Sequence, residues 1–580
     1  MSTRRRLVAG LVAGAAVLLI GRVAAVIYAE YAWYAALGAT PLWREKVYDS
    51  SVIQVTSAVF AGLFALVNLF AIRRSIVSLA FPRRLGNVEF GEEVPQKQLD
   101  RMAFALSVVV AAIMTVAVPR WESLAMLRTG ARFGETDLFF QMDLSFFTGW
   151  VPLETEVYTW CLALLVLVGA LVVGLYALTP SLRWHRGTFH VSVRVRRHLS
   201  ILSCLFLLTM AWSYRLDGYE LLIHGSGPDG MFSYIDHQWL IPAYLSLAVG
   251  TVAAAALVLV SGWIGQVRAG FFTVSAVLIF SVALDLILPS VVRQVGLATG
   301  QTARDTPYAS TRAAFTRRAY GLPRSDAAVI PKEEKRFASF ADSTRVARVM
   351  TIARDSAVVY PGASGSAIVK RSPNVAAPNL GDGLTRLGNA WAEQRLDLVW
   401  SSLPANTKLV RHRDVRERLS ALMPLFAQGS DVVPAYLGDS LTWVVELYSA
   451  SDTYPLSKHY MLAGADRSYF HHSATALINA ATGRTVIVPM PGADPIATAW
   501  RTKFPELIRP GAPDLLDALT SSPRPTIPEQ QPAEFPPGSD AAFKAAVTRL
   551  YARMRGALSA GDLKAFGAAY DSLGAIVEKR

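Results

Sequence analysis

Two ionisable residues, Arg22 and Asp285, lie well inside long apolar stretches of this 580-residue sequence. A charge in the hydrocarbon core of a membrane is costly, so such residues usually face the interior of a helix bundle and pair with one another. An ion pair between Arg22 and Asp285 would offset this cost. Three interpretations stay open: a structural ion pair, an Arg22 side chain that reaches the membrane surface, and a polar site on a transport path.

Three carboxylates, Glu135, Asp137 and Asp143, lie close together in the segment ARFGETDLFFQMDLSFF. Calcium binds several oxygen ligands, so these residues are candidates for holding a cation. Their spacing matches no known calcium-binding loop, and helix capping or solvation accounts for the same residues. We therefore assign no metal and no cofactor.

No pattern in the sequence identifies a catalytic site. GxSxG and Walker motifs are absent, and GASGS at Gly362–Ser366 has the wrong spacing for a nucleophile elbow. His459, His471 and His472 cluster, but zinc requires three or four ligands, and neither cysteines nor an HExxH pattern accompany them. We assign no catalytic residue, and the sequence favours a protein that is not an enzyme.

The run RHRDVRER contains four arginines, Arg411, Arg413, Arg416 and Arg418. They are candidates for contact with an anionic partner. The alternative is the solvated face of a helix, which is what most charge runs form. Nucleic acid is disfavoured as the partner because no nucleic-acid-binding fold signature accompanies the basic charge.

The elements that must position these residues begin with seven apolar stretches. The mean hydropathy is +0.32 and 52% of the residues are hydrophobic, and roughly 20 apolar residues suffice to span a bilayer as a helix. The sequence therefore predicts a membrane protein with a seven-helix transmembrane bundle in residues 1–292. The predicted spans are Leu7–Ala29, Ser51–Ile72, Met102–Val118, Val157–Leu178, Leu199–Ser213, Trp239–Ser261 and Phe271–Val292.

Loop charges predict the orientation of these spans. With a cytoplasmic N-terminus, the inner segments carry 15 Lys and Arg residues and the outer loops carry 6, in keeping with the enrichment of cytoplasmic loops in these residues. An odd number of spans places the C-terminal half outside the cytoplasm. The first stretch follows Arg4 to Arg6 and resembles a signal peptide, but Arg22 interrupts it, which favours a retained anchor.

Two outer loops, Pro119–Glu156 and Arg215–Gln238, are unusually rich in aromatic residues. We expect them to lie on the membrane surface or to pack over the bundle, because solvated loops rarely carry so many aromatic side chains.

Residues 293–520 are predicted to form an extracytoplasmic α+β domain. Both cysteines, Cys161 and Cys204, fall in predicted spans, so this domain contains no disulfide. Paired apolar runs around Gly438-Asp439 and Thr482-Gly483 predict two hairpins, which together suggest a four-stranded antiparallel sheet. A further strand is expected at Thr344–Ile352.

The same half contains several predicted helices. One follows the last span at residues 303–322, one runs over Asp414–Phe426 with Asp414 as its N-cap, and one over Asp494–Ile508 with Pro495 in its first turn. A Pro-rich linker is expected at residues 521–537. Residues 538–580 follow it as a C-terminal helical hairpin, with helices Asp540–Leu558 and Asp562–Lys579.

The chain resembles the uncharacterised protein family 0182 of seven-pass bacterial membrane proteins. The stretches that carry this resemblance are ARFGETDLFFQMDLSFF, TPYASTRAAFTRRAYGL, RHRDVRERLSALMPLF, SLTWVVELYSASDTYPLSKH and DPIATAWRTKFPELI. The resemblance implies seven spans and an exported domain, with no established activity. The chain departs from the family by lacking a long segment after AYGL and by having Ala303-Arg304-Asp305 where the family has an Asn-Glu pair.

These observations favour an inner-membrane protein of the bacterial envelope that acts as a scaffold through its exported domain. Its expected partners are membrane lipid and an anionic envelope polymer or another envelope protein. The alternative is a transporter or lipid-handling protein with a site inside the bundle. An exported hydrolase is a third hypothesis, and it requires a cleft with converging titratable groups.

Overall fold

The computed structural model describes the following residues: 3–76, 96–177, 182–185, 188–287, 291, 301–323, 330–335, 337, 357–370, 374–404, 406–437, 440–492, 494–508, 515–517, 540–559 and 563–577. The chain divides into two compact units, Met1–Pro523 and Arg524–Arg580. The boundaries predicted at residues 292, 520 and 537 stay predictions.

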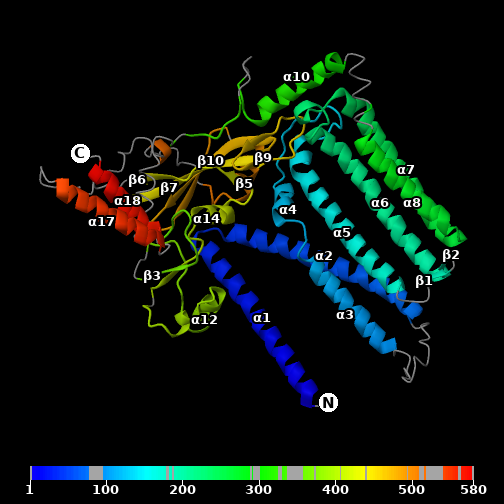
Figure 1. The fold of residues 1–580 in the computed structure, drawn as a ribbon, viewed down its shortest axis with the longest axis horizontal. Helices are drawn as coiled ribbons and strands as arrows, with labels where there is room; N and C mark the ends of the chain where they lie inside the picture. Colours follow the sequence, from blue (N-terminus) through cyan, green and yellow to red (C-terminus); the bar gives the residue numbers. More distant parts are fainter. Residues whose placement is uncertain are drawn as a thin grey trace. The chain divides into compact units, whose positions relative to one another are not determined.

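Long apolar helices fill the first half of the chain, and each predicted span overlaps one of them (Figure 1). These helices are α1 (Thr3–Ala36), α2 (Thr40–Ile76), α3 (Gln96–Met114), α5 (Val151–Ala177), α6 (Val193–Ile223), α7 (Ile241–Ile264) and α8 (Val267–Leu286).

Within the described residues, five helices are long and apolar enough to cross a membrane: α1, α2, α5, α6 and α7. Helix α3 does not qualify because it begins with the charged residues Lys97, Asp100 and Arg101. The apolar part of α8 is shorter, from Arg268 to Leu284. The structure therefore supports several membrane-crossing helices, while the predicted number of seven stays a prediction.

Helices α2, α3, α5 and α6 share a core that small and branched residues fill. Ala61 and Ala65 of α2 are fully buried, and Val168 and Val172 of α5 pack in the same cluster. The indole Nε1 of Trp160 donates to the carbonyl oxygen of Met114 at 3.0 Å. Small side chains let helix backbones approach closely, which is how helices associate where lipid removes the hydrophobic driving force.

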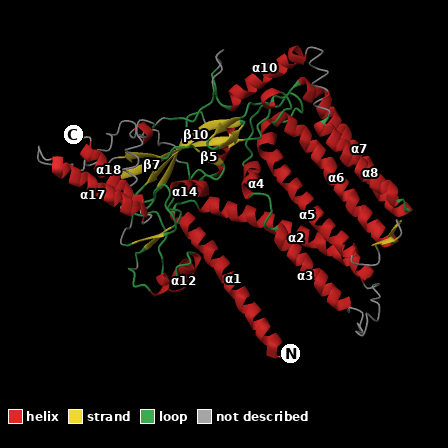
Figure 2. Cartoon of the chain, viewed as in Figure 1, coloured by secondary structure: helices red, strands yellow, loops and turns green. Residues whose placement is uncertain are grey.

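The two aromatic loops contain short elements and enter the following helices in the same way. The first holds α4 (Trp121–Arg128) and ends in a π-helical turn, Phe146–Trp150, that continues into α5. The second ends in a π-helical turn, Asp236–Leu240, that continues into α7. At the opposite end of the helices, β1 (Leu182–His185) and β2 (Thr188–Val191) pair between α5 and α6 (Figure 2).

The second half is built on an antiparallel sheet of five strands. Its order is β11-β10-β7-β5, and β6 also pairs with β7. The strands are β5 (Phe426–Gln428), β6 (Val433–Leu437), β7 (Ser440–Ser451), β10 (Tyr469–Asn479) and β11 (Thr485–Pro489). Both predicted strand pairs are present, β6 with β7 and β10 with β11. Residues 438 and 439 of the first turn lie outside the described residues.

The predicted four-stranded sheet was one strand too small. Strand β5 falls at the end of the segment predicted as the helix Asp414–Phe426. That helix, α14 (Val415–Leu422), stops earlier because Pro424 disfavours a helical conformation at the preceding residue. Asp414 caps α14 as predicted, accepting from the backbone N–H of Glu417 at 2.9 Å.

Other elements surround this sheet. They are α10 (Gln301–Ala319), β3 (Ala367–Val369), α12 (Gly383–Ala392), α13 (Asp397–Trp400), β4 (Lys408–Val410), β8 (Tyr460–Leu462), β9 (Ala465–Arg467) and α15 (Pro495–Lys503). Helices α10 and α15 were predicted, the latter with Pro495 in its first turn. The strand expected at Thr344–Ile352 and the linker at residues 521–537 lie outside the described residues.

The unit Arg524–Arg580 contains two helices, α17 (Asp540–Ser559) and α18 (Leu563–Val577), which contact each other. Both lie within the helices predicted from the sequence, with bounds that differ by a few residues.

Asp494 joins the two central strands to α15. Its carboxylate accepts hydrogen bonds from the hydroxyls of Ser449 at 2.9 Å, Ser473 at 3.0 Å and Tyr469 at 2.9 Å. It also caps α15 by accepting from the N–H of Ile496 at 3.3 Å. The side chain is buried. Its removal would take the acceptor from the Tyr469 hydroxyl, whereas the hydroxyls of Ser449 and Ser473 would still contact each other at 2.8 Å.

We expect Asp494→Ala to destabilise the sheet by about 2–4 kcal/mol, because it removes a helix cap and the acceptor of the buried Tyr469 hydroxyl. The measurement is thermal unfolding of the full chain in detergent, followed by circular dichroism. Asp431→Ala is the matched control. Asp431 is exposed, and its contact with Lys335 is long, at 3.9 Å, so this variant should leave the melting temperature nearly unchanged. Equal melting temperatures for both variants would contradict this role of Asp494.

Candidate functional site

A shared aromatic core joins the outer loops to the sheet. Phe133 of the first loop packs against Tyr454 and Tyr469, with ring centroids 5.8 and 5.5 Å apart. Phe315 of α10 lies 6.5 Å from Tyr454. The same cluster includes Leu222 at the end of α6. The loops were expected to lie on the membrane surface or to pack over the bundle. Phe140 and Phe146 pack on Tyr219 of α6, with ring centroids 5.0 and 5.2 Å apart, and Phe133 packs against the sheet as well.

Two aspartates give the first loop its shape. Asp137 is fully buried and accepts from the N–H groups of Phe139 at 2.8 Å, Phe140 at 2.6 Å and Met142 at 2.8 Å. Asp143 accepts from Phe133, Gly134 and Ser145, the last at 2.8 Å. Such side-chain to backbone bonds are typical of turns built around aspartate. The first loop can therefore present Phe133 and Phe139 in fixed positions.

Glu135, the third candidate cation ligand, contacts Arg318 of α10 instead of the two aspartates. Asp137 and Asp143 direct their oxygens to backbone N–H groups, as described above. Among the described residues no group of three His, Cys, Asp or Glu side chains is placed to hold a metal ion. The role that the contacts support for these carboxylates is to fix the loop and attach it to α10.

The second loop is closed by a buried aspartate in the same manner. Asp236 accepts from the backbone N–H and the hydroxyl of Ser226, and from the N–H of Ser233 at 2.7 Å. The following residue, His237, has its Nδ1 2.9 Å from the hydroxyl of Tyr308 on α10. The N–H of Tyr234 donates to Asp305 at 2.9 Å, so the Ala303-Arg304-Asp305 departure from the family pattern is used to hold this loop.

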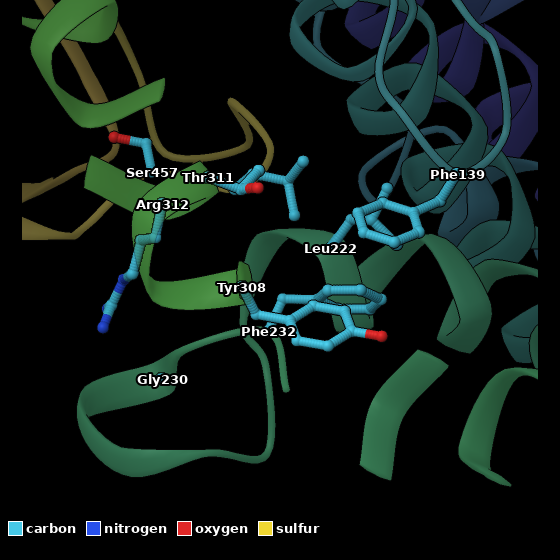
Figure 3. Close-up of a pocket in the computed structure, with 9 residues that line it drawn as sticks. Phe139, Leu222, Gly230, Phe232, Tyr308, Thr311, Arg312 and Ser457 are labelled. Carbon is cyan, nitrogen blue, oxygen red and sulfur yellow. The ribbon is translucent and has the colours of Figure 1, made fainter. Parts of the chain in front are cut away.

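A small pocket lies where the two loops meet α10 (Figure 3). Phe139, Phe232 and Tyr308 line it, with Phe232 and Tyr308 centroids 5.9 Å apart. Its volume is about 10 Å³, room for about one water molecule. Two other pockets measure about 20 and 150 Å³. All three are smaller than the roughly 300–1,000 Å³ of typical small-molecule sites.

A charged network forms a second attachment between the helices and the sheet region. Glu45 of α2 lies 3.2 Å from Arg128 of α4 and 2.6 Å from Lys503 of α15. Arg128 also contacts Asp49, whose side chain is fully buried. Three elements that are far apart in the sequence are therefore held together by four side chains.

The arginine run makes a third attachment, to the C-terminal part of α1. Arg411 pairs with Glu30 at 3.1 Å and with Glu393 at 2.6 Å. His412 lies 3.3 Å from Glu30, and its ring is 4.5 Å from that of Trp33. The guanidinium of Arg413 donates to the carbonyl oxygen of Val358 at 2.9 Å, and that of Arg416 to the carbonyl oxygen of Gly429 at 3.0 Å.

Arg418 is the most unusual residue of this run, because its side chain is fully buried. Its three nitrogens have no hydrogen-bond partner among the described residues. The guanidinium lies 5.4 Å from the Trp33 ring centroid, where the π face attracts a cation. Burial lowers the pKa of Arg418 to about 10. The predicted contact of these four arginines with an anionic partner stays a prediction, and their contacts within the chain are those given above.

Arg22 contacts the carbonyl oxygen of Trp391 on α12. The side chain of Asp285 lies outside the described residues, so the predicted pair between them stays a prediction. Helix α1 contacts α2 and α12, and α8 contacts α6 and α7.

The three clustered histidines have separate partners. His459 Nδ1 lies 2.8 Å from Asp466, His471 Nε2 lies 2.8 Å from the carbonyl oxygen of Arg318, and His472 Nε2 lies 2.6 Å from Glu446. They do not converge on one point.

Several buried polar residues were missed by the sequence analysis. Glu154 accepts from the indole N–H groups of Trp150 and Trp212, both at 2.7 Å, and contacts Arg215. Glu446 accepts from Thr475 at 2.5 Å beside the pocket of about 20 Å³. Their signal in the sequence is weak, because a lone glutamate in an apolar segment looks the same whether its partners are near or far.

The fold and these attachments define a class of protein: a multi-pass membrane protein whose apolar helices are fixed to a mixed α/β region by its own loops. The chain belongs to the uncharacterised protein family UPF0182, whose family model matches residues 7–352 and 358–518. The resemblance found in the sequence is thereby confirmed. No solved structure matches the chain.

Three bacterial relatives show the extent of the similarity. A UPF0182 protein of Desulforamulus reducens is 23% identical, covering 56% of this chain and 37% of that protein. The UPF0182 protein GSU2333 of Geobacter sulfurreducens is 26% identical, covering 51% of this chain and 34% of that protein. A UPF0182 protein of Kocuria rhizophila is 19% identical over 621 residues, covering 81% of this chain and 63% of that protein. The chain thus spans less than two thirds of the length of each.

The hydrogen bonds of Asp143 predict a pH dependence of the first loop. Burial alone would raise the pKa of Asp143, but hydrogen bonds from Ser145, Phe133 and Gly134 outweigh it and hold the pKa below the ordinary value of 3.8. A lowered pKa in the folded state stabilises the loop above the ordinary value, and this contribution is lost as the pH falls through the folded pKa.

We expect hydrogen exchange in residues 133–146 to increase between about pH 5 and about pH 3, after correction for intrinsic rates, and Asp143→Asn to remove most of that increase because it removes the titrating group. Glu135→Gln is the comparison variant. The Glu135 side chain contacts Arg318 and not the backbone N–H groups that Asp143 accepts from, so the increase at low pH should remain in this variant. An unchanged pH dependence in Asp143→Asn would show that another group controls this loop.

Proposed function

We propose that this protein is a seven-span inner-membrane protein of the bacterial envelope that presents its α/β region outside the cytoplasm as a fixed binding platform. The observation that carries this proposal is the triple attachment of that region to the apolar helices. The aromatic core, the Glu45–Arg128–Lys503 network and the Arg411–Glu30 contact act together. A region held at three places transmits binding at its surface directly to the membrane helices.

Two observations support the orientation and the number of spans. The loop charges favour a cytoplasmic N-terminus. Successive apolar helices also alternate in direction, with β1 and β2 near one end of the helices and α4 and α10 near the other (Figure 1). With α3 and α8 included, this alternation supports seven spans, with the sheet and α10 on the outer side. Residues 538–580 then form an external helical hairpin.

The partner we propose is an anionic envelope polymer or another envelope protein, in addition to membrane lipid. The region from residue 293 onward carries nine more Lys and Arg residues than Asp and Glu residues, and a basic surface attracts anionic partners.

A transport or lipid-handling function is the second candidate. The observation that favours it is a polar cluster near the ends of α2, α5 and α6, where His198 lies 2.8 Å from both the Asn68 side-chain oxygen and the Tyr176 hydroxyl. Polar side chains within membrane helices commonly mark substrate or proton paths.

Cysteine labelling in intact cells tests the orientation and the transport alternative together. In a background with Cys161 and Cys204 replaced by alanine, a membrane-impermeant maleimide should label Met461→Cys directly. Lys97→Cys should react only after permeabilisation, because its segment is predicted to be cytoplasmic. The reverse pattern would contradict the proposed orientation.

Asn68→Cys should stay unlabelled until denaturation, and its labelling in native membranes would favour a hydrated transport path.

Photo-crosslinking in native membranes tests the binding platform. A photoreactive residue at Ile330 or Met461, both exposed side chains of the α/β region, should form a discrete protein or polymer adduct. The same residue at Val59, an exposed position on α2, serves as control and should crosslink lipid. A charge reversal close to the probe should reduce the adduct several-fold. For the probe at Ile330, this variant is Lys332→Glu. No adduct at either surface position would count against the platform.

A further inference from the structure

Helix α12 lies against α1 part way along that helix (Figure 1). The Trp391 ring packs on Gly21, so closely that a Cβ at Gly21 would come within 2.7 Å of it. Ala25 and Ala29 continue the same contact toward Ala392, and Arg22 reaches the Trp391 carbonyl oxygen. Glycine and alanine at these positions leave room for the Trp391 ring on the surface of α1.

This contact lies where α1 leaves the hydrocarbon core. At 34 residues, α1 is about 51 Å long, whereas about 20 residues suffice to cross a bilayer. Residues 17–20 are apolar and 61–68% exposed, as a lipid-facing surface requires. Arg22 and Glu30 follow, and Glu30 pairs with Arg411 outside the helix. Val23, Ile27 and Tyr28 beyond Arg22 are also exposed, at 51%, 45% and 43%. Arg22 and Glu30 therefore bracket the stretch in which α1 reaches the membrane surface, and Trp391 lies beside this stretch.

An exposed apolar surface extends from this contact over α12 and α13. Leu384 is 86% exposed and Trp400 is 80% exposed, with Leu387 and Leu396 beside them in the sequence at 39% and 54%. Leu384, Leu387 and Trp391 share one face of α12, because they are three and seven residues apart. The face that packs on α1 at Trp391 is thus continued by uncovered leucines.

Three charged side chains of the same segment are engaged elsewhere, whereas Asp382 at the start of α12 is exposed. Arg386 donates to the Leu398 carbonyl oxygen at 2.6 Å and thereby holds α13 against α12. Arg395 pairs with Asp397 at 3.1 Å, and Glu393 pairs with Arg411 at 2.6 Å. Arg386, Arg395 and Glu393 therefore place no unpaired charge beside the exposed leucines and Trp400. A tryptophan at the headgroup level is typical of membrane interfaces.

We propose that the α12–α13 surface, formed by Leu384, Leu387, Leu396 and Trp400, docks on the lipid bilayer beside α1. The bilayer is the occupant because the surface is continuous with the lipid-facing side of α1 at the level of Arg22. Burial of exposed leucine and tryptophan side chains at the headgroup boundary supplies the driving force, as in interfacial helices. The inference requires that α1 crosses the membrane, and it depends neither on the orientation nor on the proposed platform function.

Spin-label accessibility tests this proposal in the full chain reconstituted into phospholipid vesicles. Cysteines at positions 384 and 400 carry a nitroxide in the Cys161→Ala, Cys204→Ala background, and the ratio of oxygen to nickel-chelate accessibility is measured. Position 461 is the matched control, since Met461 is 73% exposed on β8. Position 17 on α1 is the lipid-facing reference.

The ratio should be several-fold higher at positions 384 and 400 than at 461, and close to that at 17. A nickel-accessible pattern at 384 and 400 like that at 461 would overturn the proposal. Protection from both reagents would also overturn it, because a protein surface would then cover the patch.

Two glycine variants test whether the contact between Gly21 and Trp391 holds the α12–α13 surface against the membrane. Gly21→Val should displace Trp391 and lower the ratio at position 384 toward that at 461. Gly14→Val is the control on the same helix, because a Cβ there meets nothing within 4 Å, and it should leave the ratio unchanged. An equal ratio at 384 in both variants would show that the α1 contact does not hold this surface against the membrane.

Discussion

The packing of loop aromatic side chains against the sheet is the interaction on which the rest of the structure depends. Phe133 contacts Tyr454 and Tyr469, and Asp143 helps to position it by accepting hydrogen bonds from the backbone around it. Burying such rings supplies a large apolar area and a defined geometry. Without this core, the aromatic side chains of the loops would lack these packing partners, and the sheet would be joined to the helices mainly by charged contacts.

The two ion pairs that join α1 and α2 to the α/β region are partly buried, and Asp49 beside one of them is fully buried. The Glu45–Lys503 and Arg411–Glu30 pairs lie at helix ends, beside the apolar core and not within it. An ion pair contributes little at an exposed surface and carries a desolvation penalty when buried. Their main contribution here is orientation, since each connects an apolar helix to a particular element of the α/β region.

Arg22 shows that the position of a charged residue relative to the membrane is inferred differently once its tertiary contacts are known. Within the sequence it interrupts an apolar stretch, which suggests a residue buried in a membrane bundle. In the structure its partner is a carbonyl oxygen of α12, beside a tryptophan. A charge at this place fits the edge of a membrane, where long basic side chains reach the headgroups. The α1–α12 contact therefore joins the membrane-facing helix, the α/β region and the proposed lipid surface.

The sequence by itself determined the apolar helices, the paired strands β6–β7 and β10–β11, and the cap Asp414, because each depends on residues close together in the chain. Strand β5 was missed because three residues after a helix carry too little local pattern. Glu154, Glu446 and the buried Arg418 were also missed, because their partners or neighbours, among them Trp212, His472 and Trp33, are distant in sequence. Burial and partnership are properties of packing, so only the tertiary structure decided which loop aspartates fix a turn, where Arg22 reaches, and which leucines stay uncovered.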